Sequence, residues 1–270
     1  MTPLVFVHGF MGGGQQWQAQ RTALGAQYDV IALDLPGYGQ NAHLAAPTSI
    51  AAFARWALND LSARGIDRFH LVGHSMGGMI AQDMTAQAPG RVDRLVLYGT
   101  GATGLLPGRF ESIDASKRRA SADGPQATAR RIAATWFLEC EAADAYEGCA
   151  VIAERSSLQA ILAGLDAMET WDGQPNLAGI GARTLVIWGD HDRTYPWHQT
   201  ELLWTAIPGA SLAVLPDCAH AAHLEKPELF NRLLGDFLAA AHETGPSQPA
   251  PRAHADRAGP HPMTAPHARS

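Results

Sequence analysis

Short apolar runs alternate along most of the chain with longer segments whose apolar residues recur at helical spacing. Most of the short runs are continuous stretches of branched or aliphatic residues, as in parallel strands that are covered on both faces. This alternation predicts an α/β fold with a mostly parallel, doubly wound sheet. The predicted strands are residues 3–7, 28–33, 68–72, 94–98, 184–188 and 212–215.

Two crossover helices and a final helix are predicted where apolar residues are three or four positions apart. The final helix begins just after Pro227, because proline suits the first turn of a helix. The apolar positions are Ile50, Phe53, Ala57 and Leu61 in the first helix, Met76, Ile80 and Met84 in the second, and Leu229, Leu233 and Phe237, with Phe230, Leu234 and Leu238 beside them, in the last.

Two regions interrupt the alternation. Residues 101–181 separate two predicted strands, are rich in helix-forming residues and are too long for an ordinary connection, so we expect an inserted helical cap. Residues 243–270 are rich in Pro, Ala, His, Arg and Gly, and we expect a disordered tail because little apolar surface can be buried there. The core of the fold is then residues 1–100 and 182–242.

Composition narrows the class of protein. The 270 residues are 46% hydrophobic and carry a net charge of -6, which suits a single α/β domain with an insertion and argues against a nucleic-acid partner. No apolar stretch approaches the length of a membrane-spanning helix and no secretory leader is recognisable, so we expect no membrane attachment and a cytoplasmic location. Cys140, Cys149 and Cys218 lack disulfide or zinc spacing and are interpreted as free thiols. Oligomeric state stays open.

The candidate chemistry begins at Gly73-His74-Ser75-Met76-Gly77, a G-x-S-x-G motif between a predicted strand and a predicted helix. A serine hydroxyl is a weak nucleophile at neutral pH, so it must be projected from the backbone and supplied with a base and oxyanion donors. A strained strand-to-helix turn projects it, and the flanking glycines permit close backbone approach. We therefore predict that Ser75 is a nucleophile.

An acid and a histidine follow Ser75 in the chain order that this fold requires. Asp190 and Asp192 come directly after the predicted strand 184–188, while His220 and His223 come after the strand 212–215. Because catalytic loops gather at the carboxyl edge of a parallel sheet, these groups should converge on Ser75. The spacing alone leaves both choices open.

Five landmarks together give the chain, from about Thr2 to Leu238, a resemblance to the α/β-hydrolase superfamily. This resemblance implies that Asp192 is the acid, that His220 is the base and that no cofactor or metal is used. Alanine at position 219 departs from the glycine that is usual before the histidine. The landmarks are His8-Gly9-Phe10, the segment DLPGYG at 34–39, the motif at 73–77, the G-x-x-D-x-x-x-P spacing at 189–196, and His220 followed by Glu225-Lys226-Pro227.

The implied mechanism gives each residue a role. His220 takes the proton of Ser75 as the hydroxyl attacks a carbonyl, and Asp192 holds the imidazole in the required tautomer. The backbone N–H groups of Phe10 and Met76 form the oxyanion hole. The glycines at 12–14 give this loop freedom, and the run lacks the residues of a phosphate-binding loop.

The cap supplies candidate pocket residues. Trp136, Phe137 and Trp171 could roof an apolar pocket, although packing between helices explains each of them equally well. The cationic runs 117–119 and 130–131 could attract an anionic substrate or could be solvated helix faces.

The resemblance implies a serine hydrolase for a small carboxylic ester or lactone, similar to small bacterial esterases and 3-oxoadipate enol-lactonases. Serine at position 75 argues against haloalkane dehalogenases and epoxide hydrolases, which resemble this fold but use aspartate. The alternatives are a carbon–carbon bond hydrolase, a menaquinone-pathway lyase of the same fold, and a ligand receptor that retains the triad. His74 disfavours the first of these, which typically has asparagine before the serine.

Overall fold

The computed structural model describes residues 2–105 and 111–240, and the predicted tail at 243–270 lies outside the described residues. Six strands form one sheet in the order β2-β1-β3-β4-β5-β6, and every pair of neighbours is parallel. Each strand end lies within two residues of its predicted position, so the predicted fold class is confirmed. The strands are β1 (Leu4–Val7), β2 (Val30–Leu33), β3 (Phe69–His74), β4 (Val92–Tyr98), β5 (Arg183–Gly189) and β6 (Ser211–Leu215).

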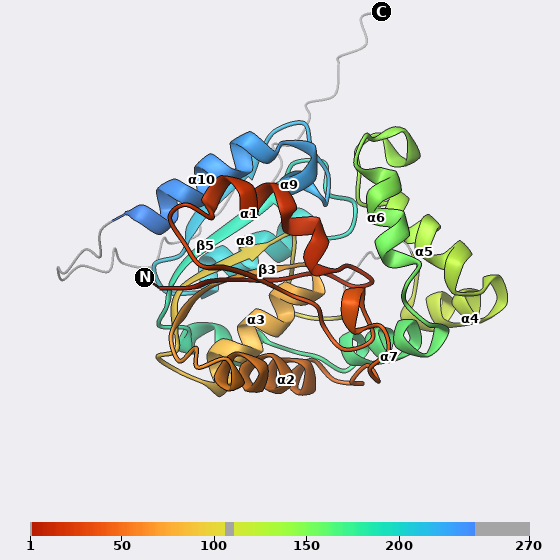
Figure 1. Ribbon diagram of the computed structural model, residues 1–270, viewed down its shortest axis with the longest axis horizontal. Coiled ribbons are helices and arrows are strands. Elements are labelled where there is room, and N and C mark those ends of the chain that lie inside the picture. Colours follow the sequence, from red (N-terminus) through yellow and green to blue (C-terminus); the bar gives the residue numbers. More distant parts are fainter. Residues whose placement is uncertain (1, 106–110, 241–270) are drawn as a thin grey trace, which may run out of the picture.

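The two faces of the sheet bury two different sets of side chains because successive residues of a strand point in opposite directions. In β1, Leu4 and Phe6 pack under α1 (Gln18–Leu24) and α10 (Pro227–Ala239). Val5 and Val7 belong to the opposite cluster. That second face is covered by α2 (Ile50–Ala63), α3 (Met76–Gln87) and α8 (Trp197–Ala206), so helices enclose the sheet on both sides (Figure 1).

Helix α10 begins at Pro227, as predicted, but its apolar stripe is narrower than expected. Phe230, Leu234 and Phe237 are buried against the sheet, whereas Leu229 is 44% exposed. Residues three or four apart share the inward face, and Leu229 is turned away from it.

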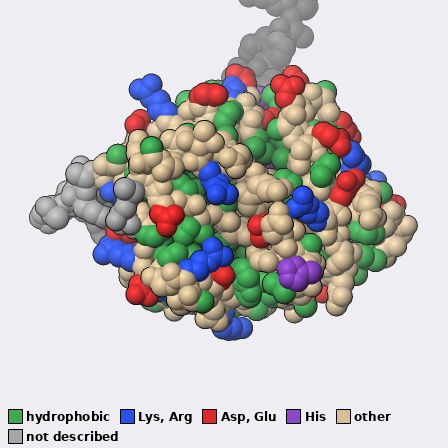
Figure 2. Space-filling model, viewed as in Figure 1, with side chains coloured by type: hydrophobic (Ala, Val, Ile, Leu, Met, Phe, Trp, Pro, Cys, Tyr) green, Lys and Arg blue, Asp and Glu red, His purple; other side chains and the backbone are tan. Residues whose placement is uncertain are grey.

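Between β4 and β5 the chain forms the helices of the predicted insertion, which Figure 1 shows beside the sheet. An antiparallel bridge joins Thr103 to Asp172, so the two ends of the insertion meet at its base. Acidic and basic side chains are interspersed on the face of the molecule in Figure 2. The helices are α4 (Ile113–Asp123), α5 (Pro125–Ala134), α6 (Tyr146–Ala153) and α7 (Leu158–Glu169), with short 3-10 turns at Cys140–Ala142 and Gln174–Gly179; elsewhere lie the short helix α9 (Ala222–Glu225) and 3-10 turns at Gly14–Trp17 and Gly39–Asn41.

Candidate active site

Ser75 occupies a sharp turn between the end of β3 and the start of α3. Its backbone has φ 56 and ψ -123, a conformation that residues other than glycine rarely adopt. The turn is held by the neighbouring strand, since the Ser75 N–H donates to the Tyr98 carbonyl at 3.0 Å. A Cβ on Gly77 would stand 2.3 Å from the Val7 carbonyl oxygen, so only glycine fits there. The predicted nucleophile elbow is thus present in the backbone.

Asp192 and His220 form a buried pair on the loops that follow β5 and β6. The imidazole Nδ1 of His220 lies 2.9 Å from Asp192 Oδ2, and the two side chains are 2% and 0% exposed. The second carboxylate oxygen of Asp192 accepts the N–H groups of Thr194 and Tyr195 at 2.7 and 3.0 Å. These bonds fix the carboxylate, which in turn orients the imidazole with Nδ1 as the donor.

The alternative acid and base lie in different surroundings. Asp190 is exposed, and its carboxylate accepts the N–H of Cys218 at 3.4 Å. His223 is buried, but its Nδ1 lies 3.3 Å from the hydroxyl of Tyr98 and not beside a carboxylate. The geometry therefore pairs the residues that the family resemblance selected.

The backbone of His220 is also held in place. Its carbonyl accepts the Tyr98 hydroxyl at 2.6 Å and lies 3.0 Å from His74 Nε2, which donates to it. His74 thus has a supporting role under the turn, as its position beside Ser75 suggested. Within the described part of the chain, the side chains of Ser75 and His220 line one cavity but are not hydrogen-bonded to each other. Such contacts often tighten only when substrate binds.

Two histidines behind His220 are buried in a way that makes stability depend on pH. Burial lowers the pKa of His74 well below 6.5 and lowers the pKa of His223 to about 3. Both side chains therefore stay neutral in the folded protein, whereas the unfolded chain binds these protons as the pH falls below about 6.5.

Acid is accordingly expected to destabilise the fold as the pH falls below about 6.5, above the range in which most carboxylates are protonated. Each of the two histidines should remove about 2 kcal/mol from the free energy of unfolding between pH 6.5 and pH 5. Urea unfolding at pH 7 and pH 5 measures this loss, and His223→Gln should reduce it. The exposed His43 offers the control, because His43→Gln should leave the loss unchanged. Equal losses in all three proteins would contradict the prediction.

The Glu225 carboxylate links the histidine loop to the cap. One oxygen accepts the N–H of Ala219 at 2.7 Å, and the other accepts the N–H of Leu138 at 2.6 Å. A third bond runs from the Ala221 N–H to the Trp136 carbonyl at 2.8 Å. The end of α5 and the loop that carries His220 are therefore joined by direct hydrogen bonds.

Glu225→Gln should weaken this link, because an amide offers one acceptor oxygen where two N–H groups require one each. We expect a loss of about 1–3 kcal/mol in stability from the unsatisfied donor and a fall in kcat of about 10-fold as His220 shifts. Thermal unfolding and ester kinetics measure the two effects. Glu228→Gln, at an exposed position in the first turn of α10, should leave kcat unchanged. Normal kcat in Glu225→Gln would show that the link does not position His220.

The loop after β1 lies against Ser75. A Cβ on Gly9 would stand only 3.0 Å from the Ser75 Cβ, which places the following residue, Phe10, at the reaction centre. His8 holds this loop: its Nδ1 donates to the Gly9 carbonyl at 2.8 Å, and its Nε2 accepts the Leu35 N–H at 3.0 Å. Met76 opens α3, so its N–H is one of the donors that a helix leaves unused in its first turn. Gly9 and Met76 thus both adjoin Ser75, and the assignment of the Phe10 and Met76 N–H groups as oxyanion donors stays a prediction.

A cavity of about 70 Å3 lies between the sheet edge and the cap, with Ser75 and His220 in its wall. At roughly 10–15 Å3 for each water molecule, it has room for about five to seven water-sized groups. Gln16 also lines the cavity, and no motif in the sequence marks this single glutamine as a site residue. Other lining residues include Phe10, Ile113, Arg131, Ile132, Trp136, Ile161, Leu165, Met168 and Tyr195.

Of the three predicted pocket residues, the cavity wall includes only Trp136 among the described residues. Phe137 is fully buried in the hydrophobic core, in the same cluster as Trp136, and does not line the cavity. Trp171 packs against Gly173 at the base of the insertion. The positions of Phe137 and Trp171 therefore agree with the alternative interpretation, in which these side chains pack within the protein and do not line the pocket.

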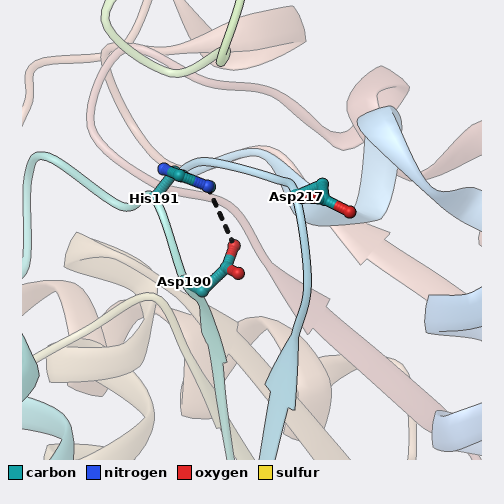
Figure 3. Close-up of side chains that lie close together, drawn as sticks. All are labelled: Asp190, His191 and Asp217. Carbon is teal, nitrogen blue, oxygen red and sulfur yellow. Dashed lines mark ion pairs between the residues drawn. The ribbon is translucent and has the colours of Figure 1, made fainter.

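Asp190, His191 and Asp217 approach one another on the surface beside these loops (Figure 3). Their potential ligand atoms lie within 4.8 Å of one another, and all three residues are exposed. Asp190 lies 3.8 Å from His191, while Asp217 lies 3.7 Å from Lys226. Solvated ion pairs account for this cluster, and we assign no metal to it.

The fold and this site define a class. Residues 4–233 match the model of the alpha/beta hydrolase family, and the chain belongs to that family. It is therefore an enzyme of the alpha/beta hydrolase type, as the resemblance implied.

Several proteins similar to this chain are named as hydrolases. The chain is 31% identical over 243 residues to the putative carbamate hydrolase RutD of Azorhizobium caulinodans. The alignment covers 87% of this chain and 91% of that relative. The enol-lactonase from Burkholderia xenovorans LB400 superposes with a TM-score of 0.81 at 25% identity, over 89% of this chain and 92% of the lactonase. A thermophilic esterase from Thermogutta terrifontis gives a TM-score of 0.80 at 25% identity, over 88% and 89% of the two chains.

None of the helices in the described part of the chain is both long and apolar enough to cross a bilayer.

Proposed function

We propose that the protein is a serine hydrolase that cleaves a small carboxylic ester or lactone through an acyl-enzyme. The observation that carries the proposal is the buried Asp192–His220 pair, whose imidazole lines the same cavity as Ser75 on its strained turn. A nucleophile, a base and an orienting acid on three separate loops are the parts that acyl transfer requires.

In this mechanism, Nε2 of His220 takes the proton of Ser75 while the hydroxyl oxygen bonds to the substrate carbonyl. The backbone N–H groups of Phe10 and Met76 bind the resulting oxyanion. His220 then protonates the leaving oxygen as its bond to the acyl carbon breaks. Water repeats the sequence on the acyl-enzyme, with His220 as the base, and releases the acid and free Ser75. No step uses a metal or an organic cofactor.

The compact cavity and the names of the relatives support a small substrate. Carbamate, enol-lactone and ester hydrolases all transfer an acyl group to water, and the proposed mechanism accommodates each of these bonds. The three free cysteines, Cys140, Cys149 and Cys218, support a reducing compartment, so we propose that the enzyme acts in the cytoplasm.

Turnover of short 4-nitrophenyl esters and covalent labelling by a fluorophosphonate test the proposal together. We expect both with the purified protein, and we expect neither to change after treatment with a metal chelator. A protein that bound esters without turnover or labelling would instead support the receptor alternative. Carbon–carbon bond cleavage would be favoured if only dienoic acids were consumed.

A further inference from the structure

One charged side chain lies in the wall of the cavity. Of the described residues that line it, only Arg131, in the last turn of α5, carries a full charge. His74 and His223, which also line the wall, do not share this property, since burial lowers the pKa of both. A small, mostly apolar cavity with a single guanidinium suits a ligand that carries one negative charge.

The donors of Arg131 are incompletely used within the described residues. Its Nε–H is buried and has no hydrogen-bond partner, and its Nη1 lies 4.0 Å from Glu111. That carboxylate is shared, because Ser116 donates to it at 2.8 Å and Arg119 lies 3.7 Å away. A buried donor without an acceptor is unfavourable, and an incoming carboxylate would satisfy it.

Arg130, the neighbouring arginine on the same helix, differs from Arg131 because its donors have acceptors within the cap. Arg130 donates to both oxygens of Glu147 and, through Nε, to Glu154 at 2.7 Å. Lys117, in the other cationic run, pairs with Asp166 and Glu169, each at 2.6 Å. These cations have structural partners on the cap, whereas Arg131 retains a donor for a ligand.

We propose that Arg131 binds a carboxylate of the substrate, so that the preferred substrates are short esters or lactones that carry a free carboxylate group. The apolar side chains of Ile132, Trp136 and Met168 line the same cavity, and a charge pair attracts more strongly where such side chains reduce the access of water. The inference rests on the proposed hydrolase function for its catalytic half, whereas anion binding itself does not require turnover.

Two esters of similar size test the selectivity. Wild-type enzyme should hydrolyse mono-4-nitrophenyl succinate with a higher kcat/KM than 4-nitrophenyl butyrate, which lacks the carboxylate. Arg131→Gln should lose about 10- to 100-fold on the charged ester and little on the neutral one. Arg131→Lys should keep part of the preference. The matched control is Arg130→Gln, which should keep all of it.

A binding measurement separates this inference from the proposed function. Ser75→Ala should bind monomethyl succinate in a calorimetric titration, and Ser75→Ala with Arg131→Gln should bind it about 10- to 100-fold more weakly. Arg131-dependent binding without hydrolysis by the wild type would refute the hydrolase while supporting the anion site. Hydrolysis of both esters with equal efficiency, unchanged in a folded Arg131→Gln protein, would overturn the anion site alone.

Discussion

Replacement of Ser75 by alanine should lower kcat for ester hydrolysis roughly 10⁵- to 10⁶-fold, because it removes the atom that forms the acyl-enzyme. Residual turnover would come from the oxyanion donors and from substrate binding alone. Alanine keeps the Cβ of serine, so the strained backbone at φ 56 is no more costly than before. We therefore expect the variant to fold, to unfold near the wild-type temperature and to resist fluorophosphonate labelling.

Ser121→Ala serves as the control for this substitution, since Ser121 lies exposed on α4 and its hydroxyl donates to the Lys117 carbonyl. Its kcat and labelling should equal those of the wild type. The proposed mechanism would be wrong if Ser75→Ala, shown to be folded, kept even a tenth of the wild-type activity.

Asp192→Asn should lower kcat about 10⁴-fold. The amide keeps the shape of the carboxylate, but it removes the negative charge that stabilises the protonated imidazole and permits the wrong tautomer of His220. Asp192 Oδ1 accepts two backbone N–H groups and Oδ2 faces the His220 Nδ1, so an amide keeps these bonds by turning its NH2 group toward Nδ1. Nδ1 must then accept, and the proton moves to Nε2, where it prevents His220 from acting as the base. Steady-state kinetics over a range of pH measure the loss.

Asp190→Asn is the matched comparison, two residues away in the same loop. Asp190 is exposed and makes one long hydrogen bond to a backbone N–H, so its replacement should change kcat less than threefold. If the two variants lost activity equally, the assignment of Asp192 as the orienting acid would fail.

Much of the fold could be predicted because its determinants are local. Continuous apolar runs specify buried parallel strands, and Gly73 to Gly77 specify the turn that presents Ser75. The choice of Asp192 over Asp190 was not contained in local chemistry, since both are short acids at a turn. It required the spacing of the family, and the structure then placed Asp192 against His220.

The cavity wall could not be predicted in the same way. Trp136 and Phe137 are adjacent and similar in character, yet only the first lines the cavity, whereas the second is fully buried in the core. Arg130 and Arg131 are chemically identical, and the acidic partners of Arg130 lie 17 and 24 residues away in the chain. Contacts between segments that are distant in the sequence decide which side chain is free to bind a ligand. These contacts cannot be read from composition or from local sequence.

The two hydrogen bonds of Glu225 have a consequence for how this enzyme could be altered by recombination. A cap taken from a relative would lack its hydrogen-bond acceptor, because the carboxylate that accepts the Leu138 N–H belongs to Glu225, 87 residues further along the chain. A chimera that exchanges residues 101–181 alone would place a foreign backbone opposite that carboxylate. A functional chimera should therefore require that the segment from Ala219 to Glu225 be exchanged together with the cap.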